Sequence, residues 1–107
     1  MLKVLFAPPA RAFIEQEIRY LRDRNPAAAT AFRMSVARLG CQLARFPHSG
    51  FLRQDIPLKG IYRIVLGDYR IDYELVTDAV LVLLVRHGHQ AEPGLPVDDD
   101  AGYEEAP

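Results

Sequence analysis

The sequence predicts an α+β domain with the element order β-α-α-β-β-β, in which an antiparallel helical hairpin packs on one face of a small, mainly antiparallel sheet. Three observations support this prediction. A short apolar segment near the start ends at two prolines, and two segments with helical spacing of apolar residues follow. The remaining segments alternate like strands or are continuously apolar. Because the helices carry the only amphipathic stripes, they should cover the apolar face of the sheet and leave its other face open to solvent.

The N-terminal strand is expected at residues 3–7, a short apolar segment bounded by Pro8 and Pro9. Proline fixes φ near the helical value and is tolerated in the first turn of a helix, so a helix can start directly behind the strand. Ile14, Ile18 and Leu21 recur at the spacing i, i+4 and i+7. This spacing places them on one face and predicts the first helix.

The joint between the two predicted helices is Asn25-Pro26. Asparagine is a good N-cap and proline a good first helical residue, so a second helix is expected to begin there and to run over residues 27–45. So short a joint makes the two helices antiparallel neighbours. The apolar seam of the second helix steps by three or four residues and comprises Phe32, Val36, Leu39, Leu43 and Phe46.

Two alternating runs, residues 62–66 and 69–75, predict a β-hairpin. Gly67-Asp68 between them forms a two-residue turn, in which the glycine supplies the positive φ that such turns require. The tyrosines of both runs share the apolar face, so we assign them to the core rather than to nucleotide stacking. The turn fixes the pairing with Leu66 opposite Tyr69, Val65 opposite Arg70, Arg63 opposite Asp72 and Ile61 opposite Glu74.

The last strand is expected at residues 79–85, after a turn at Thr77-Asp78. It is apolar at every position, which predicts a strand covered on both sides or central in the sheet. Residues 1–91 are therefore expected to form a single domain. Residues 92–107 hold six carboxylates and no Lys or Arg, with too few large apolar residues to fold, so a disordered acidic tail is expected.

The formal charge of -1 is an average over these two parts. Residues 1–91 carry 13 Lys+Arg against eight Asp+Glu, a net charge of +5, and 11 of the cations are arginine. Arginine suits bidentate binding of phosphate or carboxylate, although codon bias of a GC-rich genome gives the same composition. One cysteine excludes an internal disulfide, and no apolar run approaches the ~20 residues of a membrane helix. We expect a cytoplasmic protein without membrane contact.

Basic residues are expected to gather at one end of the sheet. The last strand runs antiparallel to the one before it, so its end returns to Arg70 and brings Arg86, His87 and His89 near it. Arg63 lies one pleat away. Arginine side chains bind phosphate, and a histidine side chain can donate or accept a proton near neutral pH. Such a cluster could therefore bind a phosphate group and catalyse proton transfer.

A purely structural interpretation of the same residues stays open. Arg63 can form a cross-strand ion pair with Asp72, and Arg70 can pair with Glu74 or Asp68. Arg86 would belong to the apolar side if the second turn had a different length.

Metal, nucleotide and cofactor binding are not expected. His87-Gly88-His89 could chelate a metal together with His48 and Cys41, but there is no second cysteine and the acidic residues are badly placed. The glycines Gly60, Gly67 and Gly88 stand alone, without a dinucleotide-binding motif or a P-loop lysine.

Several segments resemble toxins of the RelE/ParE superfamily. Arg-Asn-Pro-Ala-Ala-Ala at residues 24–29 and Ala-Arg-Phe-Pro-His-Ser-Gly at residues 44–50 resemble the ParE branch. Residues 58–64, 67–74 and 85–89 look like the sheet of the superfamily, and Gly-Asp-Tyr-Arg at residues 67–70 is more typical of RelE-like members. The likeness covers residues 1 to about 90, in the same order as the elements inferred above.

The resemblance implies a bacterial toxin of a type II toxin–antitoxin system, bound and neutralised by a cognate antitoxin in a hetero-oligomer. RelE-like members cut ribosome-bound mRNA without metal, using basic side chains on the open face of the sheet. ParE-like members are described as inhibitors of DNA gyrase.

If the protein is such an endoribonuclease, the resemblance makes Arg70, Arg86 and His89 its catalytic residues. For either target, the residues expected to bind the target or its phosphate groups are Arg63, Arg70, Arg86 and His87. Against the endoribonuclease, the residues after His89 lack the arginine and tyrosine that these nucleases tend to have there.

The long helices and the Phe-Pro-His-Ser-Gly loop favour the ParE branch, and the loop before the sheet is only weakly basic, since Asp55 offsets Arg53 and Lys59. We therefore expect a gyrase inhibitor. The alternatives are a ribosome-dependent endoribonuclease and a toxin fold that serves only as an interaction module.

Overall fold

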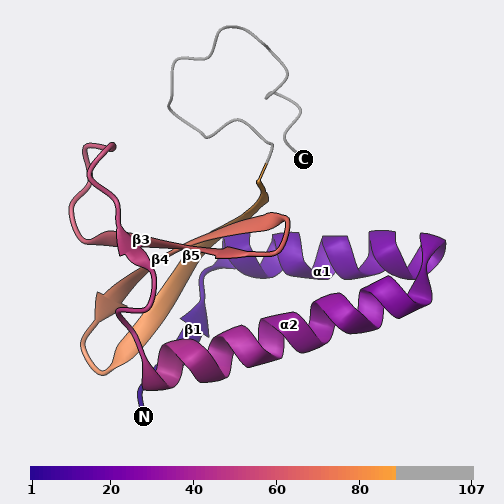
Figure 1. The fold of residues 1–107 in the computed structure, drawn as a ribbon, viewed down its shortest axis with the longest axis horizontal. Helices are drawn as coiled ribbons and strands as arrows, with labels where there is room; N and C mark the ends of the chain where they lie inside the picture. The colour runs from indigo at the N-terminus through magenta and orange to yellow at the C-terminus, as the bar shows by residue number, and fades with distance from the viewer. Residues whose placement is uncertain (89–107) are drawn as a thin grey trace, which may run out of the picture.

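The computed structural model of the chain describes residues 1–88 and has the predicted α+β architecture (Figure 1). The predicted tail at residues 92–107 and the candidate residue His89 lie outside the described residues. One element is additional to the prediction, the two-residue strand β2. The elements are β1 (Lys3–Phe6), α1 (Pro8–Arg24), α2 (Pro26–Arg45), β2 (Phe51–Leu52), β3 (Ile61–Leu66), β4 (Tyr69–Val76) and β5 (Ala79–His87).

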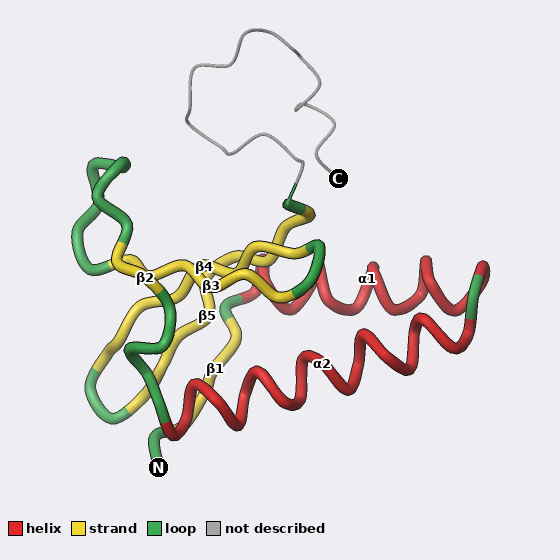
Figure 2. Tube along the Cα trace, in the orientation of Figure 1, coloured by secondary structure: helices red, strands yellow, loops and turns green. Residues whose placement is uncertain are grey.

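The five strands form one mixed sheet in the order β1-β5-β4-β3-β2, and both helices pack on one of its faces (Figure 2). Among the strand pairs of residues 1–88, only β1 and β5 are parallel. The apolar strand β5 lies between β1 and β4, as its composition predicts, because an interior strand meets no solvent at its edges. The predicted hairpin register is confirmed, with Leu66 opposite Tyr69 and Arg63 opposite Asp72.

Asn25 separates the two helices of the hairpin. Its backbone N–H donates to the carbonyl of Leu21 (2.6 Å), which closes α1, and its side chain accepts from the N–H of Ala28 (3.2 Å), which opens α2. A single residue therefore ends one helix and caps the next, as the Asn-Pro joint predicts. This tight turn lies at the end of the hairpin that projects beyond the sheet (Figures 1 and 2).

The apolar seam of α2 is confirmed except at its last position. Phe32, Leu39 and Leu43 are buried, and Val36 is half-buried. Phe46 is 61% exposed, so the prediction that it continues the seam is wrong. It is the C-cap of α2, with φ -132° and ψ 72°, and its backbone has already left the helical direction. The core comprises Ala10, Leu39, Leu43, Ile71, Tyr73, Val80, Val82 and Val85.

Tyr73 fastens the segment after α2 to the sheet. Its side chain is fully buried, and its hydroxyl donates to the carbonyl of Pro47 (2.8 Å) and accepts from the N–H of Gly50 (2.9 Å). A Cβ atom on Gly50 would lie 2.6 Å from the carbonyl oxygen of Arg63 and 2.9 Å from the Tyr73 hydroxyl. Only glycine lets the chain pass this close, so Gly50 determines how β2 enters the sheet.

Gly50→Ala should lower the free energy of unfolding by about 1–3 kcal/mol, because the added methyl group overlaps backbone that cannot move without repacking. The matched control is Gly40→Ala within α2, where no atom lies within 4 Å of the new Cβ. That change should raise stability by about 0.5–1 kcal/mol, since alanine is the better helix former. Urea unfolding measures both, and equal stability of Gly50→Ala and wild type would contradict the close approach.

Candidate functional site

Arg70 on β4 and Arg86 on β5 lie directly opposite each other on the open face of the sheet. Like charges in directly opposed cross-strand positions are destabilising. The Nε atom of Arg86 is buried, and within the part of the chain that the structure describes it is a side-chain donor without a hydrogen-bond partner. A buried donor without a partner costs about 1–3 kcal/mol. Two guanidinium groups in this arrangement can together bind an anion such as a phosphate diester.

A β-bulge in β5 creates this pair. Tyr73 pairs with Val82 while Asp72 pairs with Leu84, so Leu83 is an extra residue on β5. The extra residue reverses the alternation of every side chain that follows it. Regular pairing from the Val76–Ala79 end would place Arg86 opposite the helix-facing Tyr69; the observed register places it opposite Arg70.

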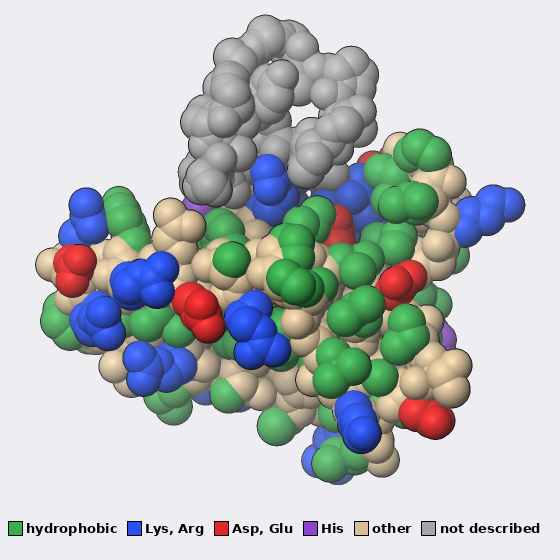
Figure 3. All heavy atoms as spheres, turned by 180° about the vertical axis from the view of Figure 1, so that it is seen from behind, with side chains coloured by type: hydrophobic (Ala, Val, Ile, Leu, Met, Phe, Trp, Pro, Cys, Tyr) green, Lys and Arg blue, Asp and Glu red, His purple; other side chains and the backbone are tan. Residues whose placement is uncertain are grey.

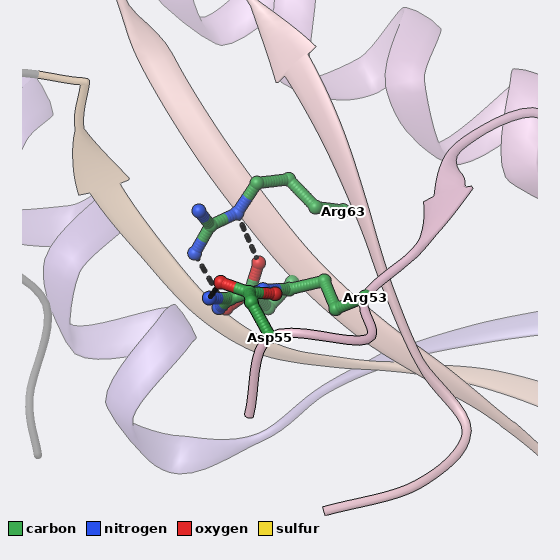
Figure 4. A network of polar contacts seen from close by, with 4 residues as sticks. Arg53, Asp55 and Arg63 are labelled. Carbon is green, nitrogen blue, oxygen red and sulfur yellow. Dashed lines mark hydrogen bonds and ion pairs between the residues drawn. The ribbon is translucent and has the colours of Figure 1, made fainter. Parts of the chain in front are cut away.

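Arg63 forms the predicted cross-strand ion pair with Asp72, within a larger buried network (Figure 4). Its Nε lies 2.7 Å from Oδ1 of Asp72 and its Nη2 lies 3.1 Å from Oδ2. Arg53 reaches the same carboxylate, with Nη1 3.2 Å from Oδ2, and also binds Asp55. Arg53, Arg63 and Asp72 are only 6%, 8% and 8% exposed. Arg63 is therefore held inside the fold and offers little surface to a target.

The sequence placed Arg53 in a weakly basic loop before the sheet and did not indicate its burial. Its backbone N–H donates to the carbonyl of Ile61 (2.7 Å), which extends the β2–β3 pairing by one step and directs the side chain onto the sheet. The Arg53 guanidinium, bound to the Asp55 carboxylate, lowers the pKa of Asp55 below its usual range. The positive charge of Arg53 is thus neutralised by two neighbouring carboxylates.

His87 lies at the predicted end of the sheet, next to Arg86 in β5, but on the opposite face from Arg70 and Arg86. The bulge turns its side chain toward α1, where Nε2 lies 3.4 Å from Oε1 of Glu17. Its ring contacts Phe13 and Tyr69, with centroid distances of 5.5 and 5.0 Å. His87 therefore does not share an anion-binding surface with Arg70 and Arg86.

Glu17 is the buried carboxylate that the sequence analysis missed. It is 7% exposed and accepts a hydrogen bond from the hydroxyl of Tyr69 (2.6 Å). The available signal was its position in α1, four residues after Phe13, on the same helix face as the apolar stripe. A buried carboxylate requires polar partners, and the partly buried Tyr69 and His87 supply them.

Tyr69, which is partly buried, and Tyr73, which is fully buried, keep their hydroxyl protons near neutral pH. Burial raises the pKa of Tyr69 well above its usual value, and the neighbouring Glu17 carboxylate raises it further. Burial likewise raises the pKa of Tyr73. Both hydroxyls therefore serve as hydrogen-bond donors that hold the core together, and neither is suited to accept a proton as a general base.

Within residues 1–88 no group of three or more His, Cys, Asp or Glu side chains is arranged to hold a metal ion. Neither α1 nor α2 is long and apolar enough to cross a membrane.

Asp72→Asn should lower the free energy of unfolding by about 3–5 kcal/mol, because it removes the carboxylate shared by two buried guanidinium groups. Asp55→Asn is the control, since it removes a carboxylate that contacts the same Arg53 but is 63% exposed. Its unfolding midpoint should stay close to that of the wild type, because exposed ion pairs contribute little. Urea unfolding compares the two, and equal losses would mean that Asp72 is not the centre of the network.

In the Tyr69→Phe variant, the free energy of unfolding should fall less steeply with rising pH in the alkaline range than in the wild type. The folded protein holds the Tyr69 proton above the pH at which the unfolded chain releases it, so stability falls as pH rises beyond about 10. Phenylalanine has no proton to release. A plot of unfolding free energy against pH between about 9 and 11 should therefore be shallower for the variant, and an unchanged slope would contradict the buried Tyr69–Glu17 contact.

Comparisons with known proteins agree with this architecture. The sequence model of the family described as "ParE toxin of type II toxin-antitoxin system, parDE" matches residues 4–92. None of the curated proteins compared with the chain matches its sequence.

Among solved structures, the chromosomal ParDE toxin–antitoxin system of P. aeruginosa is similar, with TM-score 0.66 and 13% identity over 81% of this chain and 96% of the other. The RelBE2 toxin–antitoxin complex of Mycobacterium tuberculosis gives TM-score 0.55 and 26% identity over 80% and 96%. The YoeB dimer of Staphylococcus aureus gives TM-score 0.50 and 15% identity over 78% and 92%. Since the family match spans most of the chain, the protein belongs to the ParE toxins of type II toxin–antitoxin systems.

Proposed function

We propose that this toxin inhibits DNA gyrase and is neutralised by a cognate antitoxin that binds it in a hetero-oligomer. The observation that carries the proposal is the orientation of His87, which pairs with Glu17 on the helix-covered face and not with Arg70 and Arg86 on the open face. Cleavage of RNA through its 2'-hydroxyl without metal needs a group that takes a proton and one that gives a proton. Within residues 1–88, His87 does not offer such a group on the open face, whereas Arg70 and Arg86 there can bind an anion.

The charge of the sheet supports the same choice. Residues 46–88, which contain β2 to β5, carry five Lys+Arg and five Asp+Glu, so this half of the domain has no net charge. Arg53 and Arg63 are bound to carboxylates within it. A protein that docks on ribosomal RNA through its sheet would need an excess of positive charge there, because phosphate contacts dominate such affinity. A gyrase inhibitor has no such requirement.

The similarity to known proteins supports both the ParE-like function and the antitoxin as a binding partner. The family match is to ParE toxins, and the solved systems ParDE and RelBE2 are toxin–antitoxin systems. We infer that this chain likewise has an antitoxin as its binding partner.

One observation favours a second candidate, a ribosome-dependent endoribonuclease. Arg70 and Arg86 are opposed, and Arg86 has a buried Nε without a described partner, which is an arrangement that could stabilise the charge of a phosphorane-like transition state. His89 would then supply proton transfer.

Purified full-length toxin should block negative supercoiling of relaxed plasmid by DNA gyrase. Addition of the antitoxin before the toxin should restore supercoiling, which controls for contaminants in the toxin preparation. A gel assay of plasmid topology measures both. Normal supercoiling at a large molar excess of toxin, together with cleavage of mRNA on stalled ribosomes, would replace the gyrase proposal by the endoribonuclease.

Arg70→Ala separates the two candidates further. If the toxin is the endoribonuclease, loss of this guanidinium should lower mRNA cleavage by well over tenfold. The matched control is Lys59→Ala, which removes the same charge from an exposed loop residue of the sheet half and should leave cleavage unchanged. If the Arg70→Ala variant cleaved mRNA as fast as the wild type, the Arg70–Arg86 pair would have no catalytic role.

A further inference from the structure

Almost all of the net positive charge of the described domain lies on the projecting half of the helical hairpin. We call residues 19–38 the hairpin tip; it contains five arginines and one carboxylate, Asp23, and has a net charge of +4. Figure 3 shows Lys and Arg side chains gathered over the hairpin, with few acidic side chains among them. The tip extends away from the sheet (Figure 1), so a large partner can reach it without contacting the open face.

All five arginines of the tip are exposed, and none is needed to neutralise a buried carboxylate. Within residues 1–88, Arg19, Arg22 and Arg33 take part in no ion pair. Arg24 lies over the ring of Tyr20, 3.8 Å from its centroid, and its Nη1 donates to the Tyr20 carbonyl (3.2 Å). This contact restrains the guanidinium before any partner binds, which reduces the entropy change on binding.

We propose that the hairpin tip binds the phosphate backbone of duplex DNA. Guanidinium groups form bidentate, charge-assisted hydrogen bonds with phosphate oxygens. The packed helices are about 8–10 Å apart, so arginines from α1 and α2 can contact separate phosphates of one duplex. The C-terminus of α1 and the N-terminus of α2 both lie in the tip, so their opposite helix dipoles largely cancel and the positive potential there comes from the arginines.

The aromatic residues of the tip favour a duplex over a single strand. Proteins that bind single strands stack bases on open aromatic faces. The tip has only two aromatic residues: Phe32 is buried in the domain, and Tyr20 has the Arg24 guanidinium over its ring. Arginine without an open stacking surface suits contact with the outside of a double helix, where phosphates and not bases are presented.

For its biological role the inference rests on the proposed function, since DNA gyrase acts on duplex DNA and the tip would contact DNA held by the enzyme. The binding itself can be measured without gyrase. Failure of DNA binding and failure of gyrase inhibition are therefore separate results.

The test uses full-length toxin freed from antitoxin and a fluorescent duplex of about 20 base pairs, titrated between about 50 and 200 mM salt. The variant R19Q/R22Q/R33Q removes three exposed charges from the tip, and glutamine keeps the helix propensity of arginine. We expect affinity to fall at least tenfold at ~50 mM salt. The slope of log K against log salt should become shallower by about 0.9 for each phosphate that the variant no longer neutralises.

The matched control R11Q/R45Q/K59Q removes the same charge from exposed residues outside the tip and should change affinity by less than about threefold. Equal effects of both triple variants would mean that only net charge matters and would overturn the proposal. So would the absence of duplex binding by wild type at ~50 mM salt, or a preference for single-stranded RNA of equal length. If urea unfolding shows that the triple variant is much less stable than the wild type, the single variants R19Q, R22Q and R33Q replace it. Each should lower the affinity for the duplex by a smaller factor, and the comparison with the control residues stays the same.

Discussion

The interior position of β5, between β1 and β4, is the constraint on which the rest of the molecule depends. β5 pairs with β1 on one side and β4 on the other, and its valines at positions 80, 82 and 85 enter the core beneath the helices. A regular strand cannot turn all three toward one face, because the interval from 82 to 85 is odd. The bulge at Leu83 resolves this conflict, and in doing so it turns Arg86 to the open face and His87 to the helices. The packing of the core thus decides which charged groups a target can reach.

The charge of the protein is also divided between two parts, the sheet and the helical hairpin. On the sheet, the Asp72 carboxylate neutralises Arg53 and Arg63 inside the fold, and the half that contains β2 to β5 has no net charge. On the hairpin, arginines lie exposed on a projection that two helices hold away from the sheet. Buried ion pairs mainly avoid the cost of an uncompensated charge, whereas exposed cations are free to attract a polyanion. The candidate anion-binding pair and the hairpin tip are therefore distinct surfaces.

Local patterns predicted most of the fold. The Asn-Pro joint defined the hairpin because one residue can both end and cap a helix, and Gly67-Asp68 fixed the β3–β4 register through the geometry of a two-residue turn. Phe46 and β2 were missed for different reasons. Pro47 disfavours a helical backbone at Phe46, but the regular apolar spacing outweighed this local signal. A two-residue strand such as β2 exists only through its partner β3.

The sequence by itself determined every element except β2, their order, the family resemblance and the opposition of Arg63 to Asp72, since each depends on neighbours in the chain or on one tight turn. Only the tertiary structure decided the candidate site. A run of seven apolar residues in β5 carries no alternation from which a bulge could be located. The face on which Arg86 and His87 lie, the burial of Arg53 and the pairing of Glu17 with Tyr69 all follow from contacts between distant segments, which the local periodicity of a sequence does not encode.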